Sequence, residues 1–63
     1  MVRYNKFVVK SQHDVSQFSE LWIAEKHAQL NSPASIFRGE QVSRIEGKYL
    51  HLHANDCEPI ARY

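Results

Sequence analysis

The stretch that decides the fold runs from Arg44 to Cys57 and reads RIEGKYLHLHANDC. Gly47 and Lys48 stand between two runs in which apolar and polar residues alternate. A two-residue loop with glycine in its first central position is typical of a β-hairpin. The sequence therefore predicts a hairpin over residues 41–54 that reverses at this loop.

The predicted register sorts the hairpin into an apolar face and a polar face. It pairs Glu46 with Tyr49, Ile45 with Leu50, Arg44 with His51 and Ser43 with Leu52. Successive side chains of a strand point to opposite faces, and a correct register keeps the apolar set together. We therefore expect an inward face made of Ile45, Leu50, Leu52 and Ala54. The outward face then holds Val42, Arg44, Glu46, Tyr49, His51 and His53.

Two short segments lie on either side of residues 14–30. Residues 3–10, RYNKFVVK, have the β-branched and aromatic content of a strand, with Phe7 and Val9 on one face and Val8 on the other. Residues 32–39, SPASIFRG, place a serine and a proline where a helix can start and a glycine where it can stop. We predict a strand for the first segment and a short helix for the second.

The remaining segment, residues 14–30, reads DVSQFSELWIAEKHAQL and has apolar side chains at helical spacing. Asp14 can cap the first turn, and Asn31 can end the last one. The sequence therefore predicts one amphipathic helix. We expect Phe18 and Trp22 to lie in the core of the monomer, because large aromatic residues dominate small cores.

Together these segments predict an α+β fold in which one amphipathic helix packs on a small antiparallel sheet. The expected order is strand, helix, short helix, strand, strand. The alternative is a winged helix-turn-helix, since residues 42–53 resemble the wing of small excisionase-type regulators. Residues 1–56 are expected to form a single domain. Residues 57–63 then form a C-terminal tail, either docked through Ile60 or Tyr63 or disordered.

Composition limits the classes of function. The chain has 63 residues, 43% of them hydrophobic, and a formal net charge of +1. A strongly basic nucleic-acid binder would carry more positive charge. The single cysteine, Cys57, excludes an intrachain disulfide and is typical of a reducing compartment, so we expect a cytoplasmic protein. The longest apolar run near the N-terminus, Phe7 to Val9, is too short for a membrane span.

The outward face of the hairpin is the candidate site. Aromatic rings stack on bases, and cationic side chains contact phosphates. The residues that fit these roles are Arg44, Lys48, Tyr49, His51 and His53, with Arg38 just before the hairpin. The sequence therefore favours nucleic acid as the target.

A metal site is an alternative for the same stretch. His51 and His53 point to the same side of a strand, and Asp56 and Cys57 follow. Structural zinc sites generally use several cysteines, so we expect no metal and no other cofactor. Nothing orients Cys57 as a nucleophile, and the chain has no glycine-rich phosphate loop, so we expect no catalysis.

These observations predict a small non-catalytic regulatory or accessory binding protein, with nucleic acid slightly favoured as its target. The alternative is a protein–protein interaction module, a dimerising adaptor or inhibitor, that acts through a sheet edge or an apolar face. Such a short chain buries little surface, so self-association as a homodimer is an expectation. We expect neither a membrane partner nor a small-molecule substrate.

Overall fold

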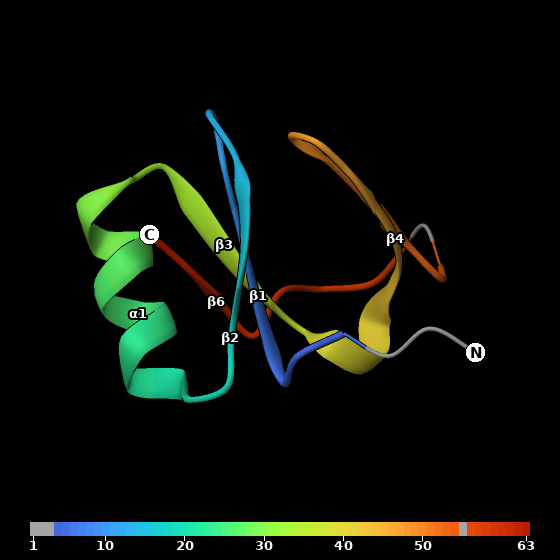
Figure 1. Ribbon diagram of the computed structural model, residues 1–63, viewed down its shortest axis with the longest axis horizontal. Helices are drawn as coiled ribbons and strands as arrows, with labels where there is room; N and C mark the ends of the chain where they lie inside the picture. The colour runs from blue at the N-terminus through green and yellow to red at the C-terminus, as the bar shows by residue number, and fades with distance from the viewer. Residues whose placement is uncertain (1–3, 55) are drawn as a thin grey trace.

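A computed structural model describes residues 4–54 and 56–63 (Figure 1). The elements in chain order are β1 (Phe7–Ser11), β2 (Val15–Phe18), α1 (Leu21–Leu30), β3 (Ala34–Arg38), a 3-10 helix η1 (Gly39–Gln41), β4 (Val42–Glu46), β5 (Tyr49–Leu52) and β6 (Ala61–Arg62). One helix on antiparallel sheets confirms the predicted α+β class. Within this described part of the chain, no helix has the length and hydrophobicity needed to cross a membrane.

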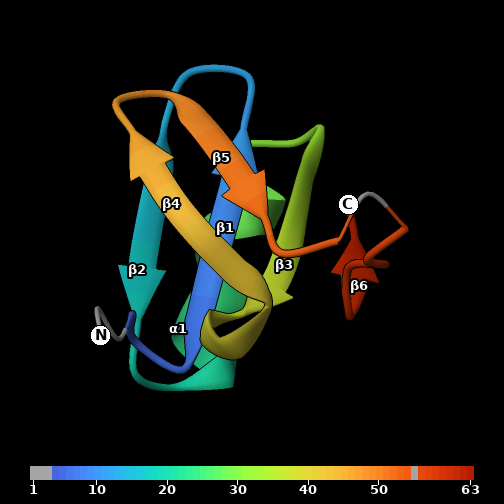
Figure 2. The same ribbon diagram turned by 90° about the vertical axis from the view of Figure 1, so that its right-hand side faces the viewer.

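The elements form three layers. The middle layer is a four-stranded antiparallel sheet of order β2-β1-β3-β6, and β4 pairs only with β5 in a separate two-stranded sheet. The helix α1 covers one face of the middle sheet, and the β4–β5 hairpin crosses over the other (Figures 1 and 2). The central strand β1 is therefore covered on both sides, and Val8 and Val9 are both completely buried.

Two small hydrophobic clusters hold the layers together. The helix-side cluster consists of Val9, Ala24, Ala28, Ala34 and Ile36, with Phe7, Phe18, Ala61 and Tyr63 packed against it. The hairpin-side cluster consists of Val8, Phe37 and Val42, with Tyr4, Val15, Ile45, Leu50 and Leu52 packed against it. The predicted alternation of β1, with Phe7 and Val9 on one face and Val8 on the other, is confirmed.

The predicted helix over residues 14–30 is wrong at its start, because Val15–Phe18 form strand β2. This strand pairs with β1 along its whole length. The turn between the two strands is closed by Ser11, whose hydroxyl accepts the backbone N–H of Asp14 at 3.2 Å. Asp14 thus belongs to a hairpin turn instead of capping a helix, and pairing with β1 overrides the local helical pattern.

The helix itself confirms one prediction and contradicts another. It ends at Asn31, whose side-chain amide donates a hydrogen bond of 2.8 Å to the carbonyl of His27. Trp22 was expected in the core but is 64% exposed. The helix instead buries Ala24 and Ala28 against the sheet, and these small side chains let it approach closely.

The predicted short helix over residues 32–39 is also wrong. Residues Ala34–Arg38 form β3, which lies between β1 and β6. Ile36 and Phe37 belong to opposite clusters, which is the alternation of a strand covered on both faces. The segment that a winged helix-turn-helix would use as its recognition helix is therefore a central strand, and that alternative is wrong.

The hairpin at β4–β5 forms as predicted at its tip. Three predicted pairs are confirmed, namely Glu46 with Tyr49, Ile45 with Leu50 and Arg44 with His51. The chain reverses at Gly47, which has a positive φ of 60°. A register shift next to Ser43 places Leu52 opposite Val42 instead of opposite Ser43. Val42 was predicted to point outward, and because of this shift it is buried in the hairpin-side cluster.

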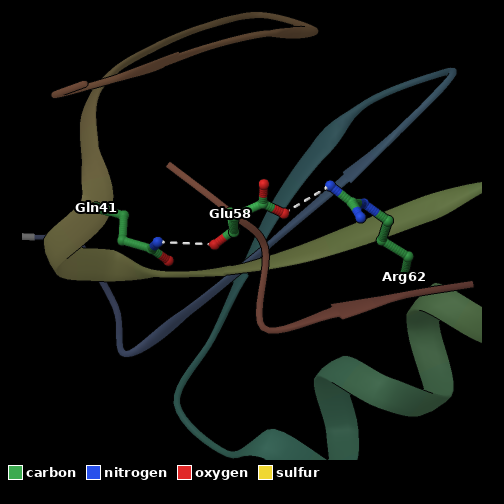
Figure 3. A network of polar contacts seen from close by, with 3 residues as sticks. All are labelled: Gln41, Glu58 and Arg62. Atoms are coloured by element: carbon green, nitrogen blue, oxygen red, sulfur yellow. Dashed lines mark hydrogen bonds and ion pairs between the residues drawn. The ribbon is translucent and has the colours of Figure 1, made fainter. Parts of the chain in front are cut away.

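The C-terminal segment joins the middle sheet. Ala61–Arg62 form β6, which pairs with β3. Glu58 anchors the chain before this strand, because its carbonyl accepts a 2.9 Å hydrogen bond from Gln41 and its carboxylate pairs with Arg62 at 3.1 Å (Figure 3). Tyr63 packs against the helix-side cluster, as the docked alternative for this segment expects. Ala54, predicted to face inward, is exposed.

Candidate nucleic-acid interface

The outward side of the β4–β5 hairpin carries the candidate site. Its exposed residues are Arg44, Glu46, Lys48, Tyr49, His51 and His53, and we call this set the outer hairpin face. Inward neighbours such as Ile45 and Leu50 pack on the hairpin-side cluster and so hold the hairpin against the sheet. Figure 2 views the molecule from the hairpin side, with the hairpin in front of β1.

Tyr49 is the aromatic centre of this face. It is 63% exposed, and the ammonium of Lys48 lies 5.9 Å from the centroid of its ring. A cation at that distance over an aromatic ring interacts with it favourably, though weakly at an exposed site. The hairpin tip therefore presents a flat ring and a positive charge side by side.

The charge of the face is smaller than its basic residues suggest. Glu46 forms an ion pair with Arg44, in which Nε of Arg44 lies 2.6 Å from Oε1 of Glu46. The same carboxylate oxygen lies 3.9 Å from Nε2 of His51. Glu46 thus offsets the charge of Arg44, and Lys48 is the cation of this face that stands beside an aromatic ring instead of a carboxylate.

Arg38 lies apart from the other predicted site residues. It stands at the end of β3, where it lines a surface hollow of about 310 Å³ together with Tyr4, Lys6 and Glu40. The structure therefore brings together five of the six predicted residues on or beside the hairpin and leaves Arg38 on the middle sheet.

The metal hypothesis finds no constellation of ligands in the structure. Across residues 4–54 and 56–63, no group of three or more His, Cys, Asp or Glu side chains is placed to hold a metal ion. Cys57 is half-buried, and its backbone N–H donates to the carbonyl of Ala54 at 3.3 Å.

A second group of cations, which the sequence did not predict, lies on the middle sheet. Lys10 on β1 and Arg62 on β6 both lie opposite Ser35 of β3, and all three line one hollow of about 320 Å³. Sequence reasoning missed this group because it assigned Ser35 to a helix and Arg62 to a tail. The alternation within ASIFR was the only available signal for the strand.

Comparisons of this chain with protein-family models, with curated proteins and with solved structures gave no match.

Proposed function

We propose that this protein is a small non-catalytic binding protein that binds single-stranded nucleic acid through the outer hairpin face. The observation that supports the proposal most directly is the exposed ring of Tyr49 with the Lys48 ammonium beside it. A ring that is accessible on a strand can stack on any base, and a neighbouring cation can contact the phosphate that follows. We also propose a cytoplasmic location, in which Cys57 stays a free thiol.

The shape of the face favours a single strand over a duplex. Bases must be unstacked before an aromatic side chain can lie against them, and bases in a duplex are stacked on each other. Reading a duplex usually requires an element that enters a groove. The hairpin instead packs across the middle sheet through its inward side chains, and Glu46 keeps the charge of its outer face low. Binding is therefore expected to be weak and to tolerate different base sequences.

Fluorescence anisotropy with short single-stranded DNA and RNA, and with a duplex of the same length, tests this proposal. Tyr49→Ala should lower the affinity for the single strands about fivefold to a hundredfold, because stacking on one aromatic residue contributes about 1–3 kcal/mol. Trp22→Ala is a matched control, since Trp22 is equally exposed but lies on α1. Equal affinities for the two variants and the wild type would refute the proposal.

Charge variants refine the assignment of the face. Lys48→Gln should reduce both the affinity and its dependence on salt, because each phosphate contact releases counterions. Arg44→Gln should have a smaller effect, since Glu46 already neutralises Arg44. A larger effect at Arg44 than at Lys48 would mean that the ion pair opens on binding and that the site is centred further down the hairpin.

The alternative function is a protein–protein interaction module that acts through β2. This strand is an edge of the middle sheet. The backbone N–H of Ser11 donates to Asp14, so by the alternation of antiparallel pairing the backbone groups of Val15 and Gln17 point away from β1. Its sequence, VSQF, holds neither a charge nor a proline, the usual protections of an edge. The edge can therefore accept another strand.

Sedimentation over a wide range of protein concentration separates the two functions. If β2 pairs with a second copy, the mass should rise with concentration, and Gln17→Lys should lower it by placing a charge on the edge. Gln12→Lys, in the exposed loop before β2, adds the same charge away from the edge and is the control. A constant monomer mass would refute self-association through β2.

A further inference from the structure

A row of three polar side chains crosses the middle sheet on its hairpin side. Lys10 lies opposite Ser35, and Ser35 lies opposite Arg62. Residues opposite each other on neighbouring strands point to the same face. Lys10 shares its face with Val8, which belongs to the hairpin-side cluster, so the whole row faces that side.

The geometry of the row suits an anion. Strands lie about 4.8 Å apart, so the Cα atoms of Lys10 and Arg62 are roughly 10 Å apart with Ser35 between them. Both long side chains can fold toward the middle and reach one bound group from two sides. The serine hydroxyl can donate a third hydrogen bond from below. These residues line a hollow of about 320 Å³, which is large enough for a phosphate group.

The present contacts of the two cations are weak enough to be exchanged. The ammonium of Lys10 donates to the carbonyl of Ser11 at 2.7 Å. Arg62 pairs with Glu58 at 3.1 Å, but both side chains are more than two-thirds exposed. Exposed ion pairs typically contribute only about 0–1 kcal/mol. Glu58 is therefore a competitor that a phosphate can displace. Asp14, in the turn after β1, accepts a hydrogen bond from the Ser11 hydroxyl.

We infer that Lys10, Ser35 and Arg62 bind a phosphate group, and that this phosphate belongs to the backbone of the strand whose bases contact the outer hairpin face. The second half of this inference rests on the proposed function. Arginine and lysine beside a hydroxyl form charge-assisted hydrogen bonds with phosphate oxygens, and arginine can do so with two of its N–H groups.

The path between the two sites runs over β5. This strand carries Tyr49 and His51 of the outer hairpin face and lies on the β3 side of the hairpin, so it is the part of that face nearest to the row (Figure 2). A hollow of about 280 Å³ follows β5 and is lined by Leu50, His51, Leu52 and Ala54. A single strand that stacks on Tyr49 can pass His51 and turn over this edge toward Arg62.

Binding of a short oligothymidylate, measured at several salt concentrations, tests the inference. Lys10→Gln and Arg62→Gln should each weaken binding several-fold and lower the magnitude of the salt slope by about 0.7, the value for one lost contact with a single strand. Glu58→Gln should strengthen binding, because it removes the competitor of the phosphate. Lys26→Gln is the control for net charge, since Lys26 is exposed on α1. Thermal unfolding of each variant verifies that it is folded.

A titration of the wild type with pyrophosphate, followed by NMR at the Ser35 and Lys10 amides, distinguishes failure of the inference from failure of the proposed function. If oligothymidylate binds but the Lys10 and Arg62 variants behave like Lys26→Gln, the inference is overturned and the proposed function stands. If no oligonucleotide binds but pyrophosphate shifts the Ser35 amide, the phosphate site stands and its ligand is not a nucleic acid. If neither probe binds, both are overturned.

Discussion

The two outer layers cover the same middle sheet in opposite ways. The helix α1 places Ala24 and Ala28 against the sheet and leaves Trp22 exposed on its other side. The hairpin places longer side chains inward, such as Leu50, and these remain only half-buried. The helix therefore contributes small side chains to its layer, whereas the hairpin contributes larger side chains that still contact water.

This difference shows how a chain of 63 residues keeps a polar outer surface on one of its layers. A small domain buries only a modest share of its surface, so each apolar side chain matters. Here β1 is shared, because Val9 serves the helix layer and Val8 serves the hairpin layer. The hairpin can then keep its outward side polar, since its inward side alone provides the packing.

The largest expected effect lies at the connection between the sheet and the hairpin. A Cβ on Gly39 would meet the backbone carbonyl oxygen of Asn5 at 2.0 Å, and backbone cannot move aside as a flexible side chain can. We predict that Gly39→Ala lowers the free energy of unfolding by about 3 kcal/mol, the upper end for overpacking. Urea denaturation measures this change, and Glu40→Ala, at the exposed neighbouring position, is the control. A loss of unfolding free energy smaller than that of Val8→Ala or Val9→Ala would mean that η1 moves to accommodate the added methyl group.

A pair of substitutions in β1 compares the two layers directly. Val8→Ala and Val9→Ala remove the same atoms from neighbouring residues that are both completely buried. We predict a loss of about 2 kcal/mol for Val9→Ala and about 1 kcal/mol for Val8→Ala, because the cost of a cavity depends on how well its surroundings relax. The half-buried Leu50 can move into the space beneath the hairpin, whereas the methyl group of Ala24 is too short to fill the space on the helix side. Equal losses in urea denaturation would show that both layers pack equally firmly.

The parts of the fold that the sequence predicts are those that local chemistry determines. Gly47 and the alternation around it predict the hairpin, and Asn31 predicts the end of the helix. The segment VSQF was mistaken for helix because its apolar residues also suit helical spacing, and ASIFR because Ser32 and Pro33 resemble a helix start and Gly39 a helix stop. Their strand structure depends on pairing with β1, a contact between distant parts of the chain that no local pattern contains.

The candidate site divides in the same way. The outer hairpin face lies within one hairpin, so its members were found together from the sequence. Glu46 was predicted to share that face, but its ion pair with Arg44 depends on side-chain positions. The row of Lys10, Ser35 and Arg62 comes from three strands, two of which were not predicted. The sequence therefore could not indicate that these residues lie together.

A smaller effect is expected at the hairpin tip. Gly47 has a φ of 60°, and a Cβ added there would meet nothing within 4 Å. The cost of Gly47→Ala is therefore backbone strain alone, about 1 kcal/mol. Gly47→Asn should cost less, since asparagine tolerates this conformation. Urea denaturation of both variants tests this order, and a loss for alanine as large as that for Gly39→Ala would place unexpected packing at the tip.

The smallest effect concerns the contact that holds the C-terminal residue to the helix layer. The Tyr63 hydroxyl donates a 3.2 Å hydrogen bond to the carboxylate of Glu25. Partial burial raises the pKa of Tyr63 above its usual 10.0, and the hydrogen bond and the negative charge of Glu25 raise it further. The folded protein thus holds this proton more tightly than the unfolded chain, so the stabilisation is complete below pH 10.0 and is lost as the pH rises through the folded pKa. The difference in unfolding free energy between the wild type and Tyr63→Phe should accordingly stay constant up to about pH 10.0 and decrease at higher pH. A difference that does not change with pH would mean that the hydroxyl is not bonded to Glu25 in solution.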